Sequence, residues 1–382
     1  MTFRSRLQIN LGLFKENIQS LRTLVLGKEI LFMAKAEAYG HGMIPLVRCA
    51  VEEMGINEIG LATVEEALAA RTQLPDLKYD IYIFTDVSLF LKQKCSSGLS
   101  REIFTQHRCI PVITSLADLK ILFEERDLRN VPLCIKVNTG MNRLGIKLIE
   151  IEESIKLIKN SGRQSIHHLM THLACASDLI SENAMNIRQK ESFEKIKSEM
   201  RGAGIKIERT SIANSGAIEQ NFGMEESHVR PGLMLYGPTG LSKQFRSASK
   251  WRGKNISRLE TSVISTMTVN QGDLVGYGAT PCPSKGFLVF IGMGYGDGLS
   301  LKFQNVSLSK EGFHARFLGR VSMDTAQILF PIEADKFFKV GDQFILWGND
   351  TEDVLSFADQ MGTIPYELFC QLTTRVSRNY SI

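Results

Sequence analysis

The amino-acid sequence predicts an α/β protein, namely a closed (β/α)8 TIM-like barrel followed by a smaller, mostly-β C-terminal domain. Three observations lead to this prediction. Short apolar runs alternate with segments of helical periodicity up to about residue 240. These runs number eight, the strand count of a closed barrel. Beyond about residue 245, most of the apolar runs are separated by Gly-rich turns and no longer by helical segments.

The predicted barrel strands are apolar runs of four to six residues. They are residues 30–34, 58–62, 80–84, 110–113, 132–137, 166–171, 209–213 and 232–235. Between them, apolar residues recur every three or four positions, as in an amphipathic helix. The clearest such segments are 64–73, 116–126, 149–160 and 182–202. An open doubly wound sheet is the alternative, but no GxGxxG sequence opens a helix after the first strand.

The C-terminal part begins with a polar, basic segment, residues 243–258, which we interpret as a linker or surface arm. Strands are expected at 259–269, 286–292, 314–318, 325–330 and 342–347, and one helix is expected at 352–361. We therefore expect a barrel domain of residues 1–244 and a mostly-β domain of residues 245–382. The first residues are allowed to pack on the second domain.

The bulk composition agrees with a soluble two-domain protein. The chain has 382 residues, with 43% hydrophobic and 23% charged side chains. A net charge of +4 without a basic tract argues against nucleic acid as a partner. No signal-peptide core and no apolar stretch near ~20 residues is present, so we expect no membrane segment and a cytoplasmic protein.

The cysteines are scattered and show no CxxC spacing, which favours reduced thiols over disulfides or a metal site. The seven are Cys49, Cys95, Cys109, Cys134, Cys175, Cys282 and Cys370.

Reactive side chains gather at the ends of the predicted barrel strands. Lys35, Arg143, His172, Asn214 and Ser215 follow a strand, Lys136 lies at the end of the fifth, and Arg230 lies at the eighth. Taken singly, each has an ordinary structural explanation, such as a solvent-facing lysine or a helix N-cap. The strand ends of a barrel share one mouth, however, so the sequence favours a common pocket. A buried lysine there can lose its proton and form a Schiff base with a carbonyl compound.

Small residues after the seventh and eighth strands indicate a phosphate site. Ser215-Gly216 and Gly232-Leu233 let the backbone approach an anion where barrels commonly hold phosphate. A strand-end lysine and a phosphate cradle in one mouth match the needs of pyridoxal 5′-phosphate (PLP).

Seven motifs along the chain resemble, in order, those of the alanine racemase family. They are residues 34–42, 138–145, 213–215, 230–237, 276–280, 294–298 and 320–324. The resemblance covers the chain from near residue 5 to near residue 380. It implies a PLP-dependent isomerase that interconverts L- and D-alanine and supplies D-alanine for peptidoglycan. It also implies a homodimer with shared active sites.

The resemblance implies roles for individual residues. Lys35 would hold PLP covalently and act as the base on one face of the substrate's α-carbon. Tyr277, reaching over from the partner subunit, would be the base on the other face. Arg230 would face the pyridine nitrogen, and His172 would hydrogen-bond to Arg230. The cofactor would also be bound by Tyr39, Asn214, Ser215, Gly232, Leu233 and Thr374.

The substrate carboxylate would be bound by Arg143 and by the backbone N–H of Met323. Tyr295 and Asp324 would shape the passage to the site. Lys136 resembles a lysine that is often carboxylated and would then buffer Arg143. The alternative for Lys136 is an ordinary barrel lysine paired with an acid.

Several positions depart from the family pattern, including the segment 299–302 at the entry passage. Glu37 stands where Asn or Asp is usual, Thr374 where many members have a tyrosine, and Ser177 where some have an acid. These departures leave open a serine-preferring or broader racemase. A PLP decarboxylase of the same architecture, or a non-catalytic PLP-binding barrel, is a less favoured alternative.

Overall fold

The computed structural model describes residues 4–92, 99–348 and 350–382. Within these ranges, eight parallel strands form a closed barrel, because the sheet that starts at β5 and ends at β6 is joined by a pairing between those two strands. The predicted fold class is confirmed. The barrel strands are β2 (Glu29–Met33), β3 (Glu58–Leu61), β4 (Asp80–Ile83), β5 (Cys109–Ile113), β6 (Cys134–Asn138), β9 (His168–Met170), β11 (Thr210–Asn214) and β12 (His228–Arg230).

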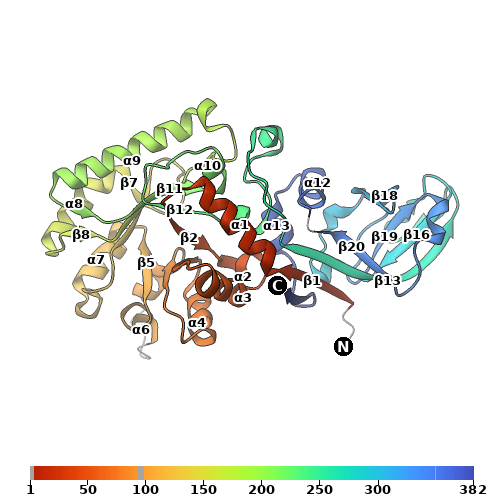
Figure 1. Cartoon of the computed structure of the whole chain (residues 1–382), viewed down its shortest axis with the longest axis horizontal. Coiled ribbons are helices and arrows are strands. Elements are labelled where there is room, and N and C mark those ends of the chain that lie inside the picture. Colours follow the sequence, from red (N-terminus) through yellow and green to blue (C-terminus); the bar gives the residue numbers. More distant parts are fainter. Residues whose placement is uncertain (1–3, 93–98, 349) are drawn as a thin grey trace.

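Helices lie between consecutive barrel strands and surround them (Figure 1). Side-chain caps start several of them, as at Thr63, Ser115 and Asn183, whose side chains accept backbone N–H groups of the first turn. The helices are α1 (Leu11–Leu24), α2 (Lys35–Tyr39), α3 (Met43–Arg48), α4 (Val64–Gln73), α5 (Val87–Lys92), α6 (Leu99–Gln106), α7 (Leu116–Glu124), α8 (Ile151–Asn160), α9 (Ala184–Gly202), α10 (Ser215–Glu219) and α11 (Leu233–Tyr236). Three short strands lie outside the barrel ring, namely β7 (Ile146–Lys147), β8 (Ser165–Ile166) and β10 (Lys206–Ile207).

A second sheet fills the other half of the molecule, on the right in Figure 1. Its strands are β1 (Ser5–Asn10), β13 (Ser257–Val269), β16 (Gly286–Ile291), β17 (Ser307–Lys310), β18 (Phe313–Phe317), β19 (Ala326–Phe330), β20 (Gln343–Trp347) and β21 (Ser377–Ser381). The N-terminal β1 lies between β13 and β21, so both chain ends belong to this sheet. A small hairpin of β14 (Leu274–Val275) and β15 (Thr280–Pro281) extends from it, and α12 (Glu352–Gln360) and α13 (Pro365–Cys370) follow β20.

The eighth predicted strand was wrong. Residues 232–235 are not a strand, because Leu233–Tyr236 form the buried turn of helix α11 and the strand is the preceding segment His228–Arg230. A short apolar run that is buried on all sides has no periodicity that separates strand from helix. The strand that the structure shows has three residues, of which His228 and Arg230 are polar. Because the prediction relied on apolar runs, it did not identify this strand.

The interpretation of residues 243–258 as a linker or surface arm was wrong in one respect, because part of the segment packs into the protein. Trp251 and Asn255 are buried, and β13 already begins at Ser257. Trp251 Nε1 donates a hydrogen bond to the carbonyl oxygen of Gly237 at 2.8 Å, and Asn255 Nδ2 donates one to that of Gly348 at 2.8 Å. Lys243, Lys250, Arg252 and Lys254 are exposed, whereas Arg246 is half-buried and pairs with Asp359 at 2.7 Å, so charge alone was a poor guide.

No helix in the described part of the chain combines the length and the apolarity that a membrane crossing requires. The six cysteines in the described ranges are unpaired, while Cys95 lies outside the described residues.

Candidate active site

Lys35 lies at the C-terminal end of the barrel, two residues after β2 ends at Met33. The chain then makes a left-handed turn, because the four residues 36–39 all have φ between 51° and 55°. L-amino acids disfavour this conformation, so neighbouring contacts must hold it. Glu66 Oε1 accepts the N–H of Ala36 at 2.6 Å, and Glu37 Oε2 accepts the N–H of Met43 at 3.1 Å. These two carboxylates fix the backbone that carries Lys35.

The Lys35 amine lies in an environment that favours its neutral form. Burial lowers its pKa, and the positive charge of Arg143 lowers the pKa further, against a smaller opposing effect of Glu66. A lysine whose pKa is lowered is unprotonated more often near neutrality, which makes it a nucleophile.

A cradle of small and polar groups faces the same end of the barrel. A Cβ atom added to Gly232 would lie 2.4 Å from Tyr39 Oη, so only glycine allows this approach. Ser215 Oγ accepts the N–H of Gly232 at 3.1 Å and that of Met234 at 3.4 Å. Burial raises the pKa of Tyr39, so its phenol keeps its proton and can donate it to an anion.

Two other predicted residues lie beside this cradle. Asn214 is the N-cap of α10, and its Oδ1 accepts the N–H of Ala217 at 3.2 Å. Leu233 begins α11 and is buried. The geometry shows a structural role for the Asn214 side chain, and its role toward a cofactor stays a prediction.

Arg230 ends strand β12 and is buried at the centre of the barrel mouth. Its guanidinium donates to Ser211 Oγ and to the carbonyl oxygen of Thr171, and Nη2 lies 3.4 Å from His172 Nδ1. Burial lowers the pKa of Arg230 to about 10, so it stays charged at neutral pH. Burial and the Arg230 charge hold the pKa of His172 far below its usual value, so the imidazole is neutral.

Lys136 projects from β6 and is buried. Within the described ranges it has neither an ion pair nor a hydrogen bond to a carboxylate, which removes the alternative of a lysine paired with an acid. Burial lowers its pKa to about 8, with the charges of Arg143, Arg230 and Lys35 acting in the same direction. Four basic side chains therefore act on one another at this end of the barrel, which suits an anionic ligand.

The predicted residues of the C-terminal part form a separate group. Tyr295 donates its N–H to the carbonyl oxygen of Ser322 at 3.0 Å, next to the exposed Met323. Asp324 pairs with Arg375 at 2.7 Å, directly after Thr374. The structure thus brings Tyr295, Met323, Asp324 and Thr374 together.

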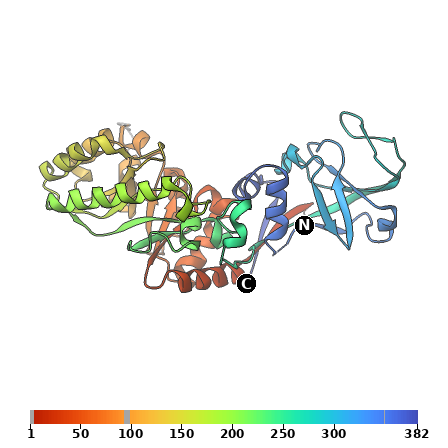
Figure 2. The same cartoon turned by 90° about the horizontal axis from the view of Figure 1, so that it is seen from above.

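Tyr277 is apart from all of these residues. It lies on the β14–β15 hairpin with 71% of its surface exposed. Residues 270–285 occupy the end of the C-terminal part that is farthest from the barrel in both views (Figures 1 and 2). Within one copy of the chain, Tyr277 therefore does not share a site with Lys35.

Comparisons with known proteins agree with this arrangement. The family model described as alanine racemase, N-terminal domain, matches residues 9–240, and the one described as alanine racemase, C-terminal domain, matches residues 256–380. The alanine racemase of Nitrosococcus oceani is 31% identical over 373 residues, covering 97% of each chain. The chain belongs to the alanine racemase family.

Other family members are similar over the whole chain. The alanine racemase of Coxiella burnetii is 29% identical and covers 98% of both chains. The structure of alanine racemase from Acinetobacter baumannii superposes with a TM-score of 0.81 at 26% identity over 100% of both chains. That of alanine racemase from Bartonella henselae with covalently bound pyridoxal phosphate has a TM-score of 0.83 at 24% identity over 100% of both chains.

The positions that depart from the alanine racemase pattern have identifiable contacts. Glu37 caps the start of α3 through Met43, as described above. Ser177 is exposed and accepts the N–H of Ser242 on its carbonyl oxygen at 2.9 Å. Thr374 is exposed in the turn after α13. The longer side chain of Glu37 therefore has a hydrogen-bond partner of its own, whereas Thr374 places a smaller side chain than tyrosine at an exposed position.

Sequence reasoning missed two kinds of residue at this site. Glu66, which holds the Lys35 turn, was detectable, because Thr63-Val64-Glu65-Glu66 matches a capping box. Ser211 and His168, which lie behind Arg230, follow no motif and carry no local signal. Only the neighbouring positions of β9, β11 and β12 in the barrel bring them together.

One group of carboxylates lies away from this site. Glu194, Glu225 and Glu226 offer oxygen atoms within 4.8 Å of one another. Lys197 contacts Glu194 at 2.7 Å and Glu226 at 2.6 Å, while Lys190 contacts Glu225 at 2.7 Å. The two lysines offset two of the three carboxylate charges, which explains how three acids lie close together here.

Proposed function

We propose that this chain is a PLP-dependent racemase that interconverts L-alanine and D-alanine. The observation that carries the proposal is the convergence, at one end of the barrel, of a lysine with a lowered pKa, an anion cradle and a buried arginine. Family membership over the whole chain supports it, as does the covalently bound cofactor of the Bartonella henselae protein.

The residues present fit PLP. Lys35 offers an amine, the hydroxyls of Tyr39 and Ser215 offer donors for a phosphate, and Gly232 leaves a space there that a Cβ atom would fill. Arg230 offers a charged donor for the ring nitrogen. When bound, PLP supplies an aldehyde that takes up the amino group and a ring that withdraws electrons from the α-carbon.

The chain's own residues would then remove a proton from one face of the α-carbon and donate a proton to the other. Lys35, whose pKa is lowered by burial, takes the α-proton from one face of the substrate or, when protonated, donates a proton there. Tyr277 does the complementary step on the opposite face, donating when Lys35 removes a proton and removing one when Lys35 donates. Arg230 keeps its own proton, so the ring nitrogen does not become fully protonated and electron withdrawal stays moderate. Such a site favours rapid return of the proton to the α-carbon.

The substrate's carboxylate needs a cationic partner near this site. Arg143 is exposed at the barrel mouth, and its charge acts on Lys35, Lys136 and His172. Together with the N–H of Met323, it would orient the substrate so that the α-proton faces a base. Tyr295 and Asp324 would line the passage.

A second copy of the chain is part of this proposal. Tyr277 is exposed on a hairpin at the far end of its own chain, so it reaches a Lys35 only in a partner subunit. A head-to-tail homodimer would use both chains in each site. The division into a cofactor domain of residues 1–244 and a domain of residues 245–382 that supplies the second base belongs to the same proposal. So do a cytoplasmic location and a role in supplying D-alanine for peptidoglycan.

The test is a panel of L- and D-amino acids incubated in deuterium oxide with the PLP-loaded protein. We expect exchange of the α-proton and loss of optical activity with alanine, and no activity in Lys35→Ala. Retention of both activities in Lys35→Ala would overturn the proposal.

A serine-preferring or broader racemase is the second candidate, and one observation favours it. Thr374 leaves an exposed, smaller side chain where many family members have a tyrosine, which opens room beside the substrate. One small group changes binding by only ~1–3 kcal/mol, so serine can compete with alanine. A higher kcat/KM for serine than for alanine in the same panel would establish this candidate. A decarboxylase would instead release CO2, and the arginine at the ring-nitrogen position argues against it.

A further inference from the structure

Behind Arg230 lies a buried hydroxyl that is itself hydrogen-bonded to a histidine. Arg230 Nη1 donates to Ser211 Oγ, and Ser211 Oγ lies 2.8 Å from His168 Nε2. Both Ser211 and His168 are fully buried. They project from neighbouring barrel strands, β11 and β9, on the side of Arg230 away from the barrel mouth.

The direction of these hydrogen bonds follows from the chemistry of the three groups. A guanidinium only donates, so Ser211 Oγ accepts from Arg230. The Ser211 hydroxyl has one proton to donate, and among the described residues in hydrogen-bond contact with it, His168 Nε2 is the group that can accept that hydrogen bond. His168 is therefore neutral, carries its proton on Nδ1 and accepts at Nε2. Burial, followed by the charges of His228 and Arg230, lowers the pKa of His168 well below its usual value, which keeps it in this state.

The same polar chain continues to the opposite end of the barrel. His168 Nδ1 lies 3.5 Å from Tyr82 Oη, and Arg209 donates to Tyr82 Oη at 3.1 Å. Arg209 also donates to His167 Nε2 at 2.9 Å and pairs with Glu58 at 2.6 Å. The histidine ring is thus held from both sides.

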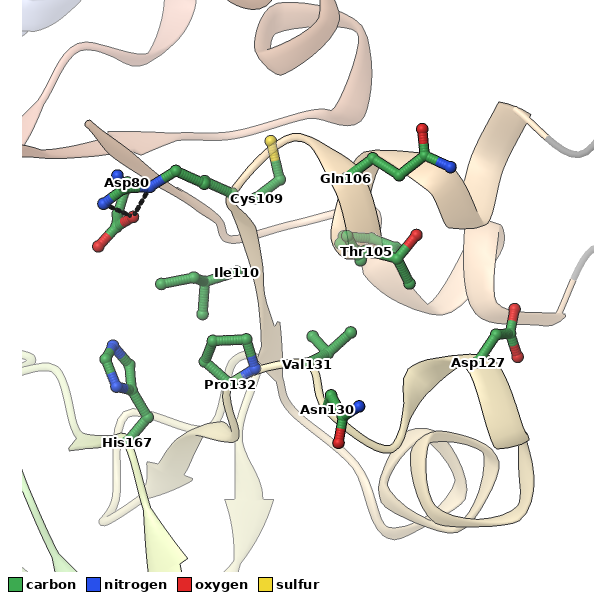
Figure 3. A pocket seen from close by; sticks show the side chains of 12 residues that line it. Asp80, Thr105, Gln106, Cys109, Ile110, Asp127, Asn130, Val131, Pro132 and His167 are labelled. Carbon is green, nitrogen blue, oxygen red and sulfur yellow. Dashed lines mark hydrogen bonds and ion pairs between the residues drawn. The ribbon is translucent and has the colours of Figure 1, made fainter. Parts of the chain in front are cut away.

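His167 lines a cavity of about 430 Å³ at this end (Figure 3). Asp80, Arg108 and Pro132, which also line it, lie at or just before the first residues of barrel strands. The cavity therefore opens away from Lys35. The polar chain ends near solvent there, whereas Ser211 and His168 are enclosed.

We propose that Ser211 and His168 are positioning residues for Arg230. His168 Nε2 accepts a hydrogen bond from the Ser211 hydroxyl. This orients a lone pair of Ser211 Oγ toward Arg230 Nη1, and the resulting hydrogen bond fixes the guanidinium where it faces the ring nitrogen. This inference rests on the proposed function, because the orientation of Arg230 matters through the cofactor. Neither residue touches the cofactor or the substrate.

The test measures the bound cofactor as well as the activity. In Ser211→Ala, Arg230 loses an acceptor. We expect the Kd for PLP, titrated into the apoprotein, to rise about tenfold, the effect of one hydrogen bond to a charged group. We also expect the absorption maximum of the bound cofactor to shift, because the charge beside the ring nitrogen moves. His168→Leu removes the acceptor for the Ser211 proton and should produce the same shift.

Two further variants separate positioning from a general loss of packing. His168→Gln places an amide oxygen near the position of Nε2 and should restore most of the wild-type Kd and spectrum. The double variant Ser211→Ala/His168→Leu should have the same Kd for PLP and the same spectrum as Ser211→Ala alone, because both changes break the same chain of hydrogen bonds to Arg230. Ser5→Ala is the matched control. It removes a buried hydroxyl that hydrogen-bonds to Thr261 within the second sheet, away from the barrel, and it should leave the absorption spectrum of the bound cofactor unchanged.

The outcomes are distinguishable. A wild-type protein that does not bind PLP contradicts the proposed function itself. A wild type that binds PLP, with unchanged Kd and spectrum in Ser211→Ala, overturns the positioning role alone. Additive effects in the double variant, or no rescue by His168→Gln, also overturn it. If Ser211→Ala does not fold, Ser211→Cys, a weaker acceptor, provides the same comparison with a smaller expected shift.

Discussion

At the scale of single residues, the site depends on small groups that leave room and on buried charges that lack counterions. Gly232 provides the room, because a Cβ atom there would lie 2.4 Å from Tyr39 Oη. Lys136 is the clearest buried charge, since it has no acidic partner within the described ranges. Each of them leads to a prediction.

The first prediction concerns Gly232. We expect Gly232→Ala to weaken PLP binding by at least about tenfold, because the methyl group and the Tyr39 hydroxyl compete for the cradle. A cofactor titration of the apoprotein measures this. Gly202→Ala is the matched control, because a Cβ there meets no atom within 4 Å. A Gly232→Ala protein that binds PLP as tightly as the Gly202→Ala protein would contradict the cradle.

The second prediction concerns pH and Lys136, which we propose is carboxylated. Only the neutral amine reacts with CO2, and the pKa of about 8 means that the neutral fraction rises as the pH rises through 8. At fixed dissolved ¹³CO2, the carbamate signal in ¹³C NMR should increase over that range and be absent in Lys136→Gln. Arg143→Gln removes a positive charge, so the pKa of Lys136 should rise and the increase should begin at higher pH. A signal that survives Lys136→Gln would refute the assignment.

At the scale of elements, the turn at residues 36–39 is a strained part of the backbone. Four consecutive non-glycine residues have positive φ. Each is expected to cost about 1–2 kcal/mol relative to a right-handed conformation. The hydrogen bonds from Glu66 and Glu37 oppose this cost, so the turn keeps Lys35 in one place.

The third prediction tests that strain. Ala36 is exposed, so Ala36→Gly removes the steric cost without losing buried surface, and we expect the free energy of unfolding of the apoprotein to increase by about 1 kcal/mol. Denaturant unfolding measures it. Ala69→Gly, in the right-handed helix α4, should instead lower the free energy of unfolding by about 0.5–1 kcal/mol. A loss of stability in both variants would show that the turn is not strained.

The same scale shows what could be predicted from the sequence. Seven barrel strands are short, continuous apolar runs between polar segments, and helices such as α4 begin with a capping box, so both leave a local signal in the sequence. Strand β12 and helix α11 do not, since β12 is short and polar while α11 is apolar on all sides. The early β1 was missed as a strand because its partners, β13 and β21, lie about 250 residues or more away in the sequence.

The candidate site divides in the same way. Lys35 and Ser215 lie just after barrel strands, Arg230 is the last residue of one, and each belongs to a recognisable sequence motif. The structure places all three at one end of the barrel. Their roles stay predictions until they are tested. Ser211 and His168 could not be found, because a hydrogen bond between two adjacent strands depends on register, which local sequence does not encode.

At the scale of the whole molecule, the central claim is that one active site uses two chains. Lys35 lies at the barrel mouth, whereas the segment 270–285, whose hairpin carries the exposed Tyr277, lies at the far end of the other half (Figure 2). A homodimer with two-fold symmetry would bring each Tyr277 to the partner's barrel and build two equal sites. This claim makes the fourth prediction.

The most direct test of the central claim is complementation between two inactive variants, Lys35→Ala and Tyr277→Phe, co-expressed with different tags and purified as the mixed dimer. One site of that dimer combines an intact Lys35 with an intact Tyr277, and the other site lacks both. We expect each variant alone to be nearly inactive in alanine racemisation and the mixed dimer to regain about half of the wild-type activity. A mixed dimer that stays as inactive as its parents would contradict the account.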